Sequence, residues 1–176
     1  MINNIDILGK FYNLKIIDAS NNYIEEVVLK LDNLEQLNLS NNYLRKFPLL
    51  ENGMKKLKFL NLNSNRLTDM QEVICEFTPN IKHLDIGSNL MDYENFNDFY
   101  DFLMKIKQWK HITHLIVEGN PFFLPENILK FPNINVIEEF INKLKSLEVF
   151  NGDNMLTVKK NLKTSQIEHK LRENNA

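Results

Sequence analysis

The sequence predicts an α/β solenoid, in which short parallel strands stack into one curved sheet on the concave side and helices or turns return along the convex side. The first observation is an eleven-position pattern that recurs five times, apolar at positions one, four, six and eleven and asparagine at position nine. The second is a group of apolar segments after the fifth copy, which can form a helical C-terminal cap. A single repeat cannot bury its own apolar face, so the copies must stack.

The repeated pattern predicts the strands. Its copies begin at Leu14, Leu34, Leu57, Ile81 and Ile112, with steps of 20, 23, 24 and 31 residues. Positions four and six are two residues apart, which places their side chains on one face of a strand. The asparagine at position nine follows the strand, where its amide can satisfy backbone groups of its own and the neighbouring turn. We therefore predict a buried asparagine ladder, formed by Asn22, Asn42, Asn65, Asn89 and Asn120.

The longest step contains a helical insertion near 92–110. Six apolar side chains recur there at helical spacing: Tyr93, Phe96, Phe99, Leu103, Ile106 and Trp109. We predict a helix of about four turns that lies on the convex side with this stripe in the core. The alternative is a partner helix bound at this surface, with Tyr100 and Phe102 exposed beside the stripe.

The two ends of the array need caps. Ile5, Leu8 and Phe11 are expected to shield the first repeat. After the fifth copy, residues 133–144 predict an amphipathic helix and residues 144–152 a truncated strand and turn. Thr157 then begins a charged helix or tail over 157–176. The predicted repeat domain, with about five repeats and its cap, therefore spans 1–156.

Composition narrows the class of protein. The chain has 176 residues, a net charge of −2 and 27 asparagines, and its only cysteine is Cys75. The length suits one domain, and a single cysteine excludes an internal disulfide. Residues 1–13 lack the features of a signal peptide, and no apolar run approaches the roughly 20 residues of a spanning helix. We expect an intracellular protein, cytoplasmic or nuclear, without a membrane partner.

The tail of the array carries a family resemblance. Gly119-Asn120-Pro121 and the segment Leu147–Gly152 match a tail motif of G-N-P, a helix and then L-x-x-L-D-G, with Asn151 where the motif has Asp. Over residues 11–152 the chain resembles the short intracellular leucine-rich repeat proteins with 22-residue-type repeats. Their members include the type-1 phosphatase regulatory subunit, the axonemal dynein leucine-rich light chain, the spliceosomal A-prime protein and the repeat domain of the mRNA export factor. The resemblance implies noncatalytic protein binding, in some members within ribonucleoprotein complexes, and it does not choose among them.

The outward positions of the strands are the candidate binding residues. Position three holds Ile16, Gln36, Phe59, His83 and His114, and position five holds Asp18, Asn38, Asn61, Asp85 and Ile116. This predicted concave surface is polar to mildly acidic and contains no lysine or arginine, which argues against a phosphate-binding groove. A protein partner that presents a helix or a basic segment fits it better, and Phe59 is the expected hot spot. A merely hydrated solvent face is the alternative.

A second candidate column follows the ladder asparagines at position ten. It holds Tyr23, Tyr43 and Arg66, which either extend the binding surface along one rim or stack to rigidify adjacent turns. His83 and His114, with Asp85 and Glu118, are a weak candidate for zinc or for pH-sensitive binding. Cys75 is expected to be buried rather than reactive.

These observations lead to one prediction and one alternative. We predict a noncatalytic interaction module or scaffold, monomeric on its own and without a cofactor, that binds a protein through the concave face. The alternative is a component of a ribonucleoprotein complex of the splicing or mRNA-export type. RNA would then be contacted only indirectly or through the tail residues Lys159, Lys160 and Lys163. No phosphate loop, metalloprotease motif or nucleophile elbow occurs in the sequence.

Overall fold

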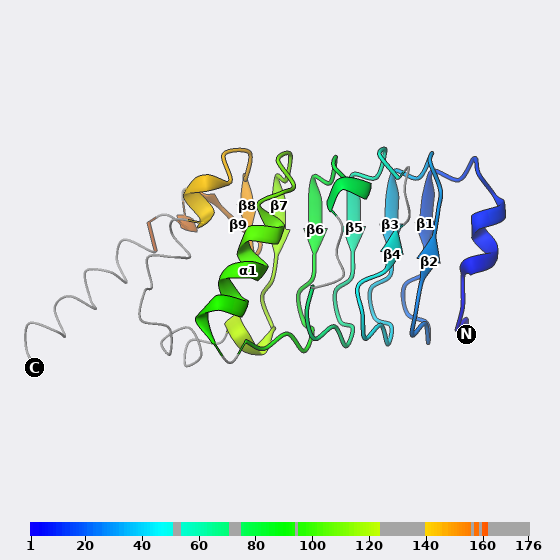
Figure 1. The fold of residues 1–176 in the computed structure, drawn as a ribbon, viewed down its shortest axis with the longest axis horizontal. Coiled ribbons are helices and arrows are strands. Elements are labelled where there is room, and N and C mark those ends of the chain that lie inside the picture. The colour runs from blue at the N-terminus through cyan, green and yellow to red at the C-terminus, as the bar shows by residue number, and fades with distance from the viewer. Residues whose placement is uncertain are drawn as a thin grey trace, which may run out of the picture.

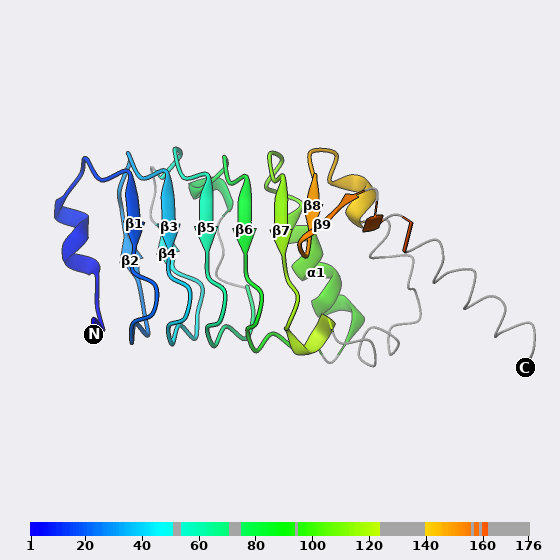
Figure 2. The ribbon, with the colours of Figure 1, turned by 180° about the vertical axis from the view of Figure 1, so that it is seen from behind.

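A computed structural model shows the predicted solenoid (Figure 1). It describes residues 1–50, 54–70, 75–93, 95–123, 140–155, 157–158 and 160–161, without the side chain of Phe96. The strands stand side by side in chain order along the long axis of the molecule, as both ribbon views show (Figures 1 and 2). The fold expected from the repeated pattern is therefore confirmed.

The main sheet has seven strands in the order β1-β3-β5-β6-β7-β8-β9. Their bounds are β1 Ile16–Asp18, β3 Gln36–Asn38, β5 Phe59–Asn61, β6 His83–Asp85, β7 His114–Ile116, β8 Val149–Phe150 and β9 Asp153–Asn154. Neighbours from β1 to β8 pair in parallel, whereas β8 and β9 pair antiparallel. The register places equivalent positions of the five copies opposite one another, so Leu37 lies between Ile17 and Leu60.

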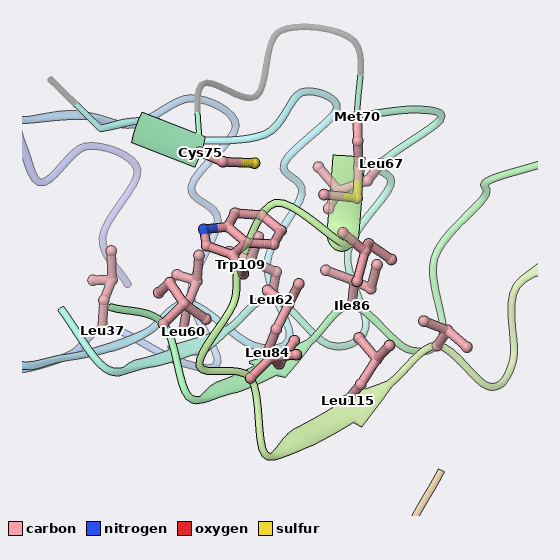
Figure 3. Close-up of a cluster of buried hydrophobic side chains, with 14 of the residues drawn as sticks. Leu37, Leu60, Leu62, Leu67, Met70, Cys75, Leu84, Ile86, Trp109 and Leu115 are labelled. Atoms are coloured by element: carbon pink, nitrogen blue, oxygen red, sulfur yellow. The ribbon is translucent and has the colours of Figure 1, made fainter. Parts of the chain in front are cut away.

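The core lies between this sheet and the convex segments. The side chains at pattern position four, Ile17, Leu37, Leu60, Leu84 and Leu115, are all buried. Because position six, directly after each strand, is buried too, each repeat contributes these two side chains and the apolar residues of its turn to one continuous cluster. Figure 3 shows the middle of this cluster, where the indole of Trp109 lies between Cys75 and the leucines Leu62 and Leu84.

The convex side is built from short elements of several kinds. They are a parallel strand pair, β2 Val28–Leu29 and β4 Leu49–Leu50, the 3-10 turns η2 Cys75–Phe77 and η3 Pro121–Phe123, and the helix α1 Phe96–Ile106. The two ribbon views place α1 on one side of the main sheet, near β7 and β8 (Figures 1 and 2). Asn95 caps the N-terminus of helix α1, because its side chain accepts a hydrogen bond from the Asp98 backbone N–H at 3.0 Å.

Helix α1 differs from the expectation in two ways. It has 11 residues, about three turns rather than four. Phe102 is only 3% exposed, so the alternative that exposed it is wrong, whereas Tyr100 is 40% exposed. The Phe102 ring packs edge-on against Phe122, with ring centroids 5.0 Å apart, because the η3 turn returns beneath the helix.

Trp109 explains why the helix ends early. The chain turns after Ile106 so that the indole can enter the core, where Trp109 is fully buried. Its Nε1–H donates to the backbone oxygen of Thr78 at 3.0 Å and lies 3.3 Å from the Thr78 hydroxyl. Thr78 is the one polar residue at the position three before each copy, and its hydroxyl offers the indole of the next repeat a second acceptor beside the backbone oxygen.

The N-terminal end is closed by residues before the first copy. Ile5 is buried and Leu8 packs against the core, whereas Phe11 is 56% exposed and does not shield the first repeat as expected. The turn η1 spans Asp6–Lys10. The Ile2 backbone N–H donates to the side-chain oxygen of Asn22 at 2.8 Å, so Ile2 substitutes for the repeat that would precede the array.

The C-terminal cap is described in part. Residues 140–143 are helical, and Phe140, Ile141 and Leu144 are buried against the end of the core. Residues 133–139 of the predicted amphipathic helix lie outside the described residues, as do Lys159, Lys163 and 164–176 of the tail. Among the described residues, no helix has the length and apolar character needed to cross a membrane.

Candidate interaction surface

Buried asparagine amides hold the strand ends that position the outward side chains. The Asn65 amide nitrogen donates to the backbone oxygens of Leu39 and Leu62 at 2.9 and 3.1 Å, and its oxygen accepts from the Leu44 N–H at 3.0 Å. Asn42, Asn89 and Asn120 make the equivalent bonds between their own neighbours. Asn22, at the end of the array, is half-buried. The ladder therefore joins each turn to the preceding repeat.

Each strand ends with a second recurring bond at position five. The side-chain oxygens of Asp18, Asn38, Asn61 and Asp85 accept from the backbone N–H two residues later, at 2.9–3.1 Å. These residues occupy the predicted concave column. Part of their hydrogen-bonding capacity is thus used to terminate the strand, and the bond at Ser20 lowers the pKa of Asp18.

The turn also requires a left-handed residue at position eight. Asn21, Asn41, Ser64 and Ser88 have φ between 51 and 56°, and Gly119 has φ of 78°. Sequence reasoning missed these residues. Position eight is asparagine in the first two copies, serine in the next two and glycine in the fifth. Only asparagine and glycine are residue types that indicate a positive φ from sequence alone.

The fifth repeat lacks the side-chain acceptor because position five is Ile116. Asn151 supplies it from the cap: its side-chain oxygen accepts from the backbone N–H groups of Val117 and Glu118 at 2.8 and 3.1 Å. Asn151 has φ of 50°, a conformation that asparagine tolerates better than most residues. The residue that departs from the family tail motif therefore closes the last full repeat.

Three rings stack in register along the middle of the concave face, which we define as the sheet face of the outward positions. The centroids of Phe59 and His83 are 4.5 Å apart, and those of His83 and His114 are 5.5 Å apart. Burial and the neighbouring His114 lower the pKa of His83, against the opposing effect of Asp85. The neutral imidazole is therefore favoured in the folded protein.

The apolar side chains of this face are accessible at several points. Ile16 is 61% exposed, and Phe59, which is itself one of the stacked rings, is half-buried, as are Ile116 and Val149. Gln36 is exposed and Asn61 is half-buried. Asp85 is only 8% exposed, because its oxygen also accepts from the Asn63 amide at 3.0 Å. Asp85 therefore differs from the expectation of an outward, accessible carboxylate.

The rim column forms a stack of its own. The rings of Tyr23 and Tyr43 lie 5.5 Å apart at an interplanar angle of 21°, and the Arg66 guanidinium lies 4.1 Å from the centre of the Tyr43 ring. A pocket of about 480 Å³ follows along the same rim, lined by Arg45, Lys46, Phe47, Arg66, Thr68, Asp69 and Leu90. Sequence reasoning found the column but not the pocket, whose walls come from three successive repeats.

The remaining chemical candidates are weak. Among the residues described, no group of three or more histidine, cysteine, aspartate or glutamate side chains is arranged to hold a metal ion. Cys75 is buried, its thiol lies 3.5 Å from the Lys105 backbone oxygen, and burial raises its pKa to about 11. Both observations agree with the expectation of a structural rather than reactive cysteine.

Comparisons with known proteins agree with the repeat architecture. A family model described as leucine-rich repeats (2 copies) matches residues 32–75. The chain is 34% identical over 113 residues to an acidic leucine-rich nuclear phosphoprotein 32-related protein of Plasmodium falciparum. That match covers 59% of this chain but only 37% of the relative, so the chain spans well under half of the relative's length.

Solved structures show the same fold. A chain of the Drosophila melanogaster SNF/U2A′ complex superposes with a TM-score of 0.53 and 21% identity, over 81% of this chain and 76% of that one. A leucine-rich repeat protein of Leptospira interrogans gives 0.52 and 20% identity, over 81% of this chain and 38% of that one. With five in-register copies, a parallel sheet of one strand per repeat and a family model that matches residues 32–75, the chain has the fold of a leucine-rich repeat solenoid.

Proposed function

We propose that this protein is a noncatalytic interaction module that binds a protein partner through its concave face, extended by the Tyr23–Tyr43 rim. The observation that carries the proposal is a partly exposed apolar seam on the outward face of the sheet, with Ile16 exposed and Phe59 and Ile116 half-buried. Ile16, Phe59 and Ile116 point away from the core, and none of them is needed to fill it. Exposed apolar and aromatic side chains within a polar surface are typical of interface anchors.

The charge of this face indicates the chemistry of the partner. The outward strand positions carry Asp18 and Glu118 at their edge but neither lysine nor arginine. The cations nearest to the strands lie at the preceding position, where Lys58 pairs with Glu35 at 3.1 Å. A partner segment that is apolar with some positive charge complements this arrangement better than a phosphate backbone does.

The test is differential capture with the 176-residue chain. The variant Phe59→Ala/Ile116→Ser removes the centre of the seam without opening the core, whereas Leu49→Ser removes an exposed apolar side chain from the convex strand β4. Proteins recovered by wild type and Leu49→Ser but lost from the double variant support the proposal. An identical set of proteins recovered by all three forms would contradict it, provided that the melting temperatures agree.

Asp85→Lys is unsuitable for this test. The Asp85 carboxylate is buried and accepts from Asn63 and from the Gly87 N–H, so a lysine there would disturb the strand end. Loss of binding by such a variant would not distinguish a lost contact from a damaged repeat.

A role in a ribonucleoprotein complex is the second candidate. It is supported by the likeness in fold to a chain of the SNF/U2A′ complex and by the relative named as a nuclear phosphoprotein 32-related protein. Crosslinking in cells, followed by mapping of modified peptides, tests it. RNA adducts within 157–176 favour this role. If the protein has this role, we also expect a tagged form of it to be found in the nucleus. Absence of adducts together with salt-insensitive protein capture favours the protein-binding role alone.

A further inference from the structure

The rim pocket beside Arg66 has a chemistry opposite to that of the concave face. Its lining includes three cationic side chains, Arg45, Lys46 and Arg66, and one carboxylate, Asp69. Neither arginine forms an ion pair with another of the described residues, and both are exposed. Two exposed arginine side chains therefore line one hollow.

The guanidinium of Arg66 is held in place before any ligand binds. It lies over the Tyr43 ring at 4.1 Å, and that ring is itself stacked on Tyr23. The Arg66 backbone N–H donates to the Leu44 oxygen at 2.8 Å, so the residue is fixed at both ends. A side chain held in this way loses less conformational freedom when it binds an anion than a freely moving one. Its planar fork also suits the two oxygens of a carboxylate.

The same pocket has an apolar side. Leu90 is 54% exposed, and the half-buried Phe47 ring is supported from below by Trp109, with ring centroids 6.4 Å apart. The volume of about 480 Å³ admits a large apolar side chain and lies within the range of roughly 300–1,000 Å³ usual for ligand pockets. Leu90 has no role in the core, although it occupies the position equivalent to Tyr43 and Arg66.

We propose that this pocket is a second docking site, which binds an acidic peptide segment of a partner protein. An aromatic or aliphatic side chain of that segment enters between Phe47 and Leu90, and flanking carboxylates pair with Arg45 and Arg66. The charge complementarity and the apolar wall together select this occupant. The site shares Tyr43 and Arg66 with the proposed rim, but it does not depend on binding at the concave face.

Fluorescence anisotropy with a fluorescein-labelled peptide of sequence EDEFEDE tests the proposal on the full chain. Saturable binding by wild type is expected, with at least a tenfold loss of affinity in Arg45→Gln/Arg66→Gln and in Leu90→Asp. The matched control is Lys107→Gln/Lys110→Gln, which removes the same charge from two exposed lysines and should change affinity less than twofold. Phe59→Ala/Ile116→Ser should also bind normally, which separates this site from the concave face.

Three outcomes overturn the proposal. One is the absence of saturable binding by the wild-type chain. A second is an equal loss in the lysine control, which indicates nonspecific attraction of charge. The third is binding of an EDESEDE peptide, or of a labelled uridine oligonucleotide, that is as tight as binding of EDEFEDE and depends equally on the two arginines. The pocket would then recognise negative charge alone.

Discussion

The side-chain oxygen of Asn151 accepts a hydrogen bond from the Val117 backbone N–H at 2.8 Å, in the place where a strand carbonyl accepts it in the earlier repeats. In the preceding repeat, for comparison, the Ile86 N–H donates to the backbone oxygen of Ile116. Asn151 therefore replaces a missing strand contact by a side chain, and it does so while its own backbone turns out of the sheet.

This relationship predicts opposite results for two substitutions at Asn151. Asn151→Asp keeps the accepting oxygen and a residue that tolerates positive φ, so its free energy of unfolding should stay within about 0.5 kcal/mol of wild type. Asn151→Ala leaves two N–H groups without that acceptor and should cost roughly 1–3 kcal/mol. Urea denaturation measures both. Equal stability of the alanine and aspartate variants would contradict the assigned role.

Asn65 is expected to be essential to the stability of the array. Asn65→Ala removes a buried amide that bonds Leu39, Leu62 and Leu44, and each unpaired buried backbone group costs about 1–3 kcal/mol. A loss of at least about 3 kcal/mol should appear in urea denaturation. The control Asn13→Ala changes an exposed asparagine and should stay within about 0.5 kcal/mol. Similar losses of stability in the two variants would show that the buried asparagine ladder contributes no more to stability than an exposed asparagine does.

Gly87 is expected to tolerate no side chain. A Cβ there would lie 2.8 Å from the Asn63 amide nitrogen and 2.9 Å from the Glu118 backbone oxygen. Gly87→Ala should therefore lower the free energy of unfolding by about 1–3 kcal/mol. Gly9→Ala is the matched control, because nothing lies within 4 Å of its added Cβ, and it should be neutral or stabilising. Calorimetry measures the stability of both variants. A Gly87→Ala variant that is more stable than Gly9→Ala would contradict the close packing at the ends of strands β6 and β7.

Stability should depend on pH through His83. Its pKa is lowered by burial and by His114 from the ordinary value of 6.5, so the unfolded chain binds the proton more readily. The stability that the folded protein gains from keeping His83 neutral is fully present above pH 6.5. It is lost as the pH falls from 6.5 through the lower pKa of His83 in the folded protein. The titratable groups facing the ring are His114 on β7 and Asp85 on its own strand.

The measurement is urea denaturation of His83→Gln between pH 7.5 and 5. We expect the fall in stability towards acid pH to be smaller in this variant than in wild type. His111→Gln, at an exposed position, should retain the wild-type slope. If His83→Gln leaves the slope unchanged, the pH dependence has another origin.

Cys75 should be protected from alkylation in the folded protein. Only the thiolate reacts, and burial both raises the pKa of Cys75 to about 11 and limits access to the thiol, which lies 3.5 Å from the Lys105 backbone oxygen. Labelling by iodoacetamide at pH 8 should be at least about 100-fold slower than in urea, since two pKa units alone reduce the thiolate a hundredfold. Mass spectrometry measures the rate, with Cys75→Ser as the blank. Comparable rates in the folded and unfolded chain would place the thiol at the surface.

The strands and the ladder could be predicted from the sequence because both depend on periodic side chains. Leu37 and Leu39 fix one face by alternation alone, and the asparagine spacing fixes the turn. The burial of Asp85 could not be predicted, since it depends on Asn63 from the neighbouring repeat and on the absence of a side chain at Gly87. Phe102 was equally inaccessible to pattern reasoning, because Phe122 covers it from a turn twenty residues later. The binding role of the concave residues remains a proposal.

The antiparallel strand β9 has a consequence for self-association. A parallel array ends in an open row of N–H and C=O groups, which is a template for another chain to add to. Here Asp153 and Asn154 pair with Phe150 and Val149 in the reverse direction, over two residues that are both exposed and polar. An incoming strand would meet neither the parallel direction nor the apolar side chain that a further repeat after β8 would present. This arrangement disfavours the growth of filaments from this end of the sheet.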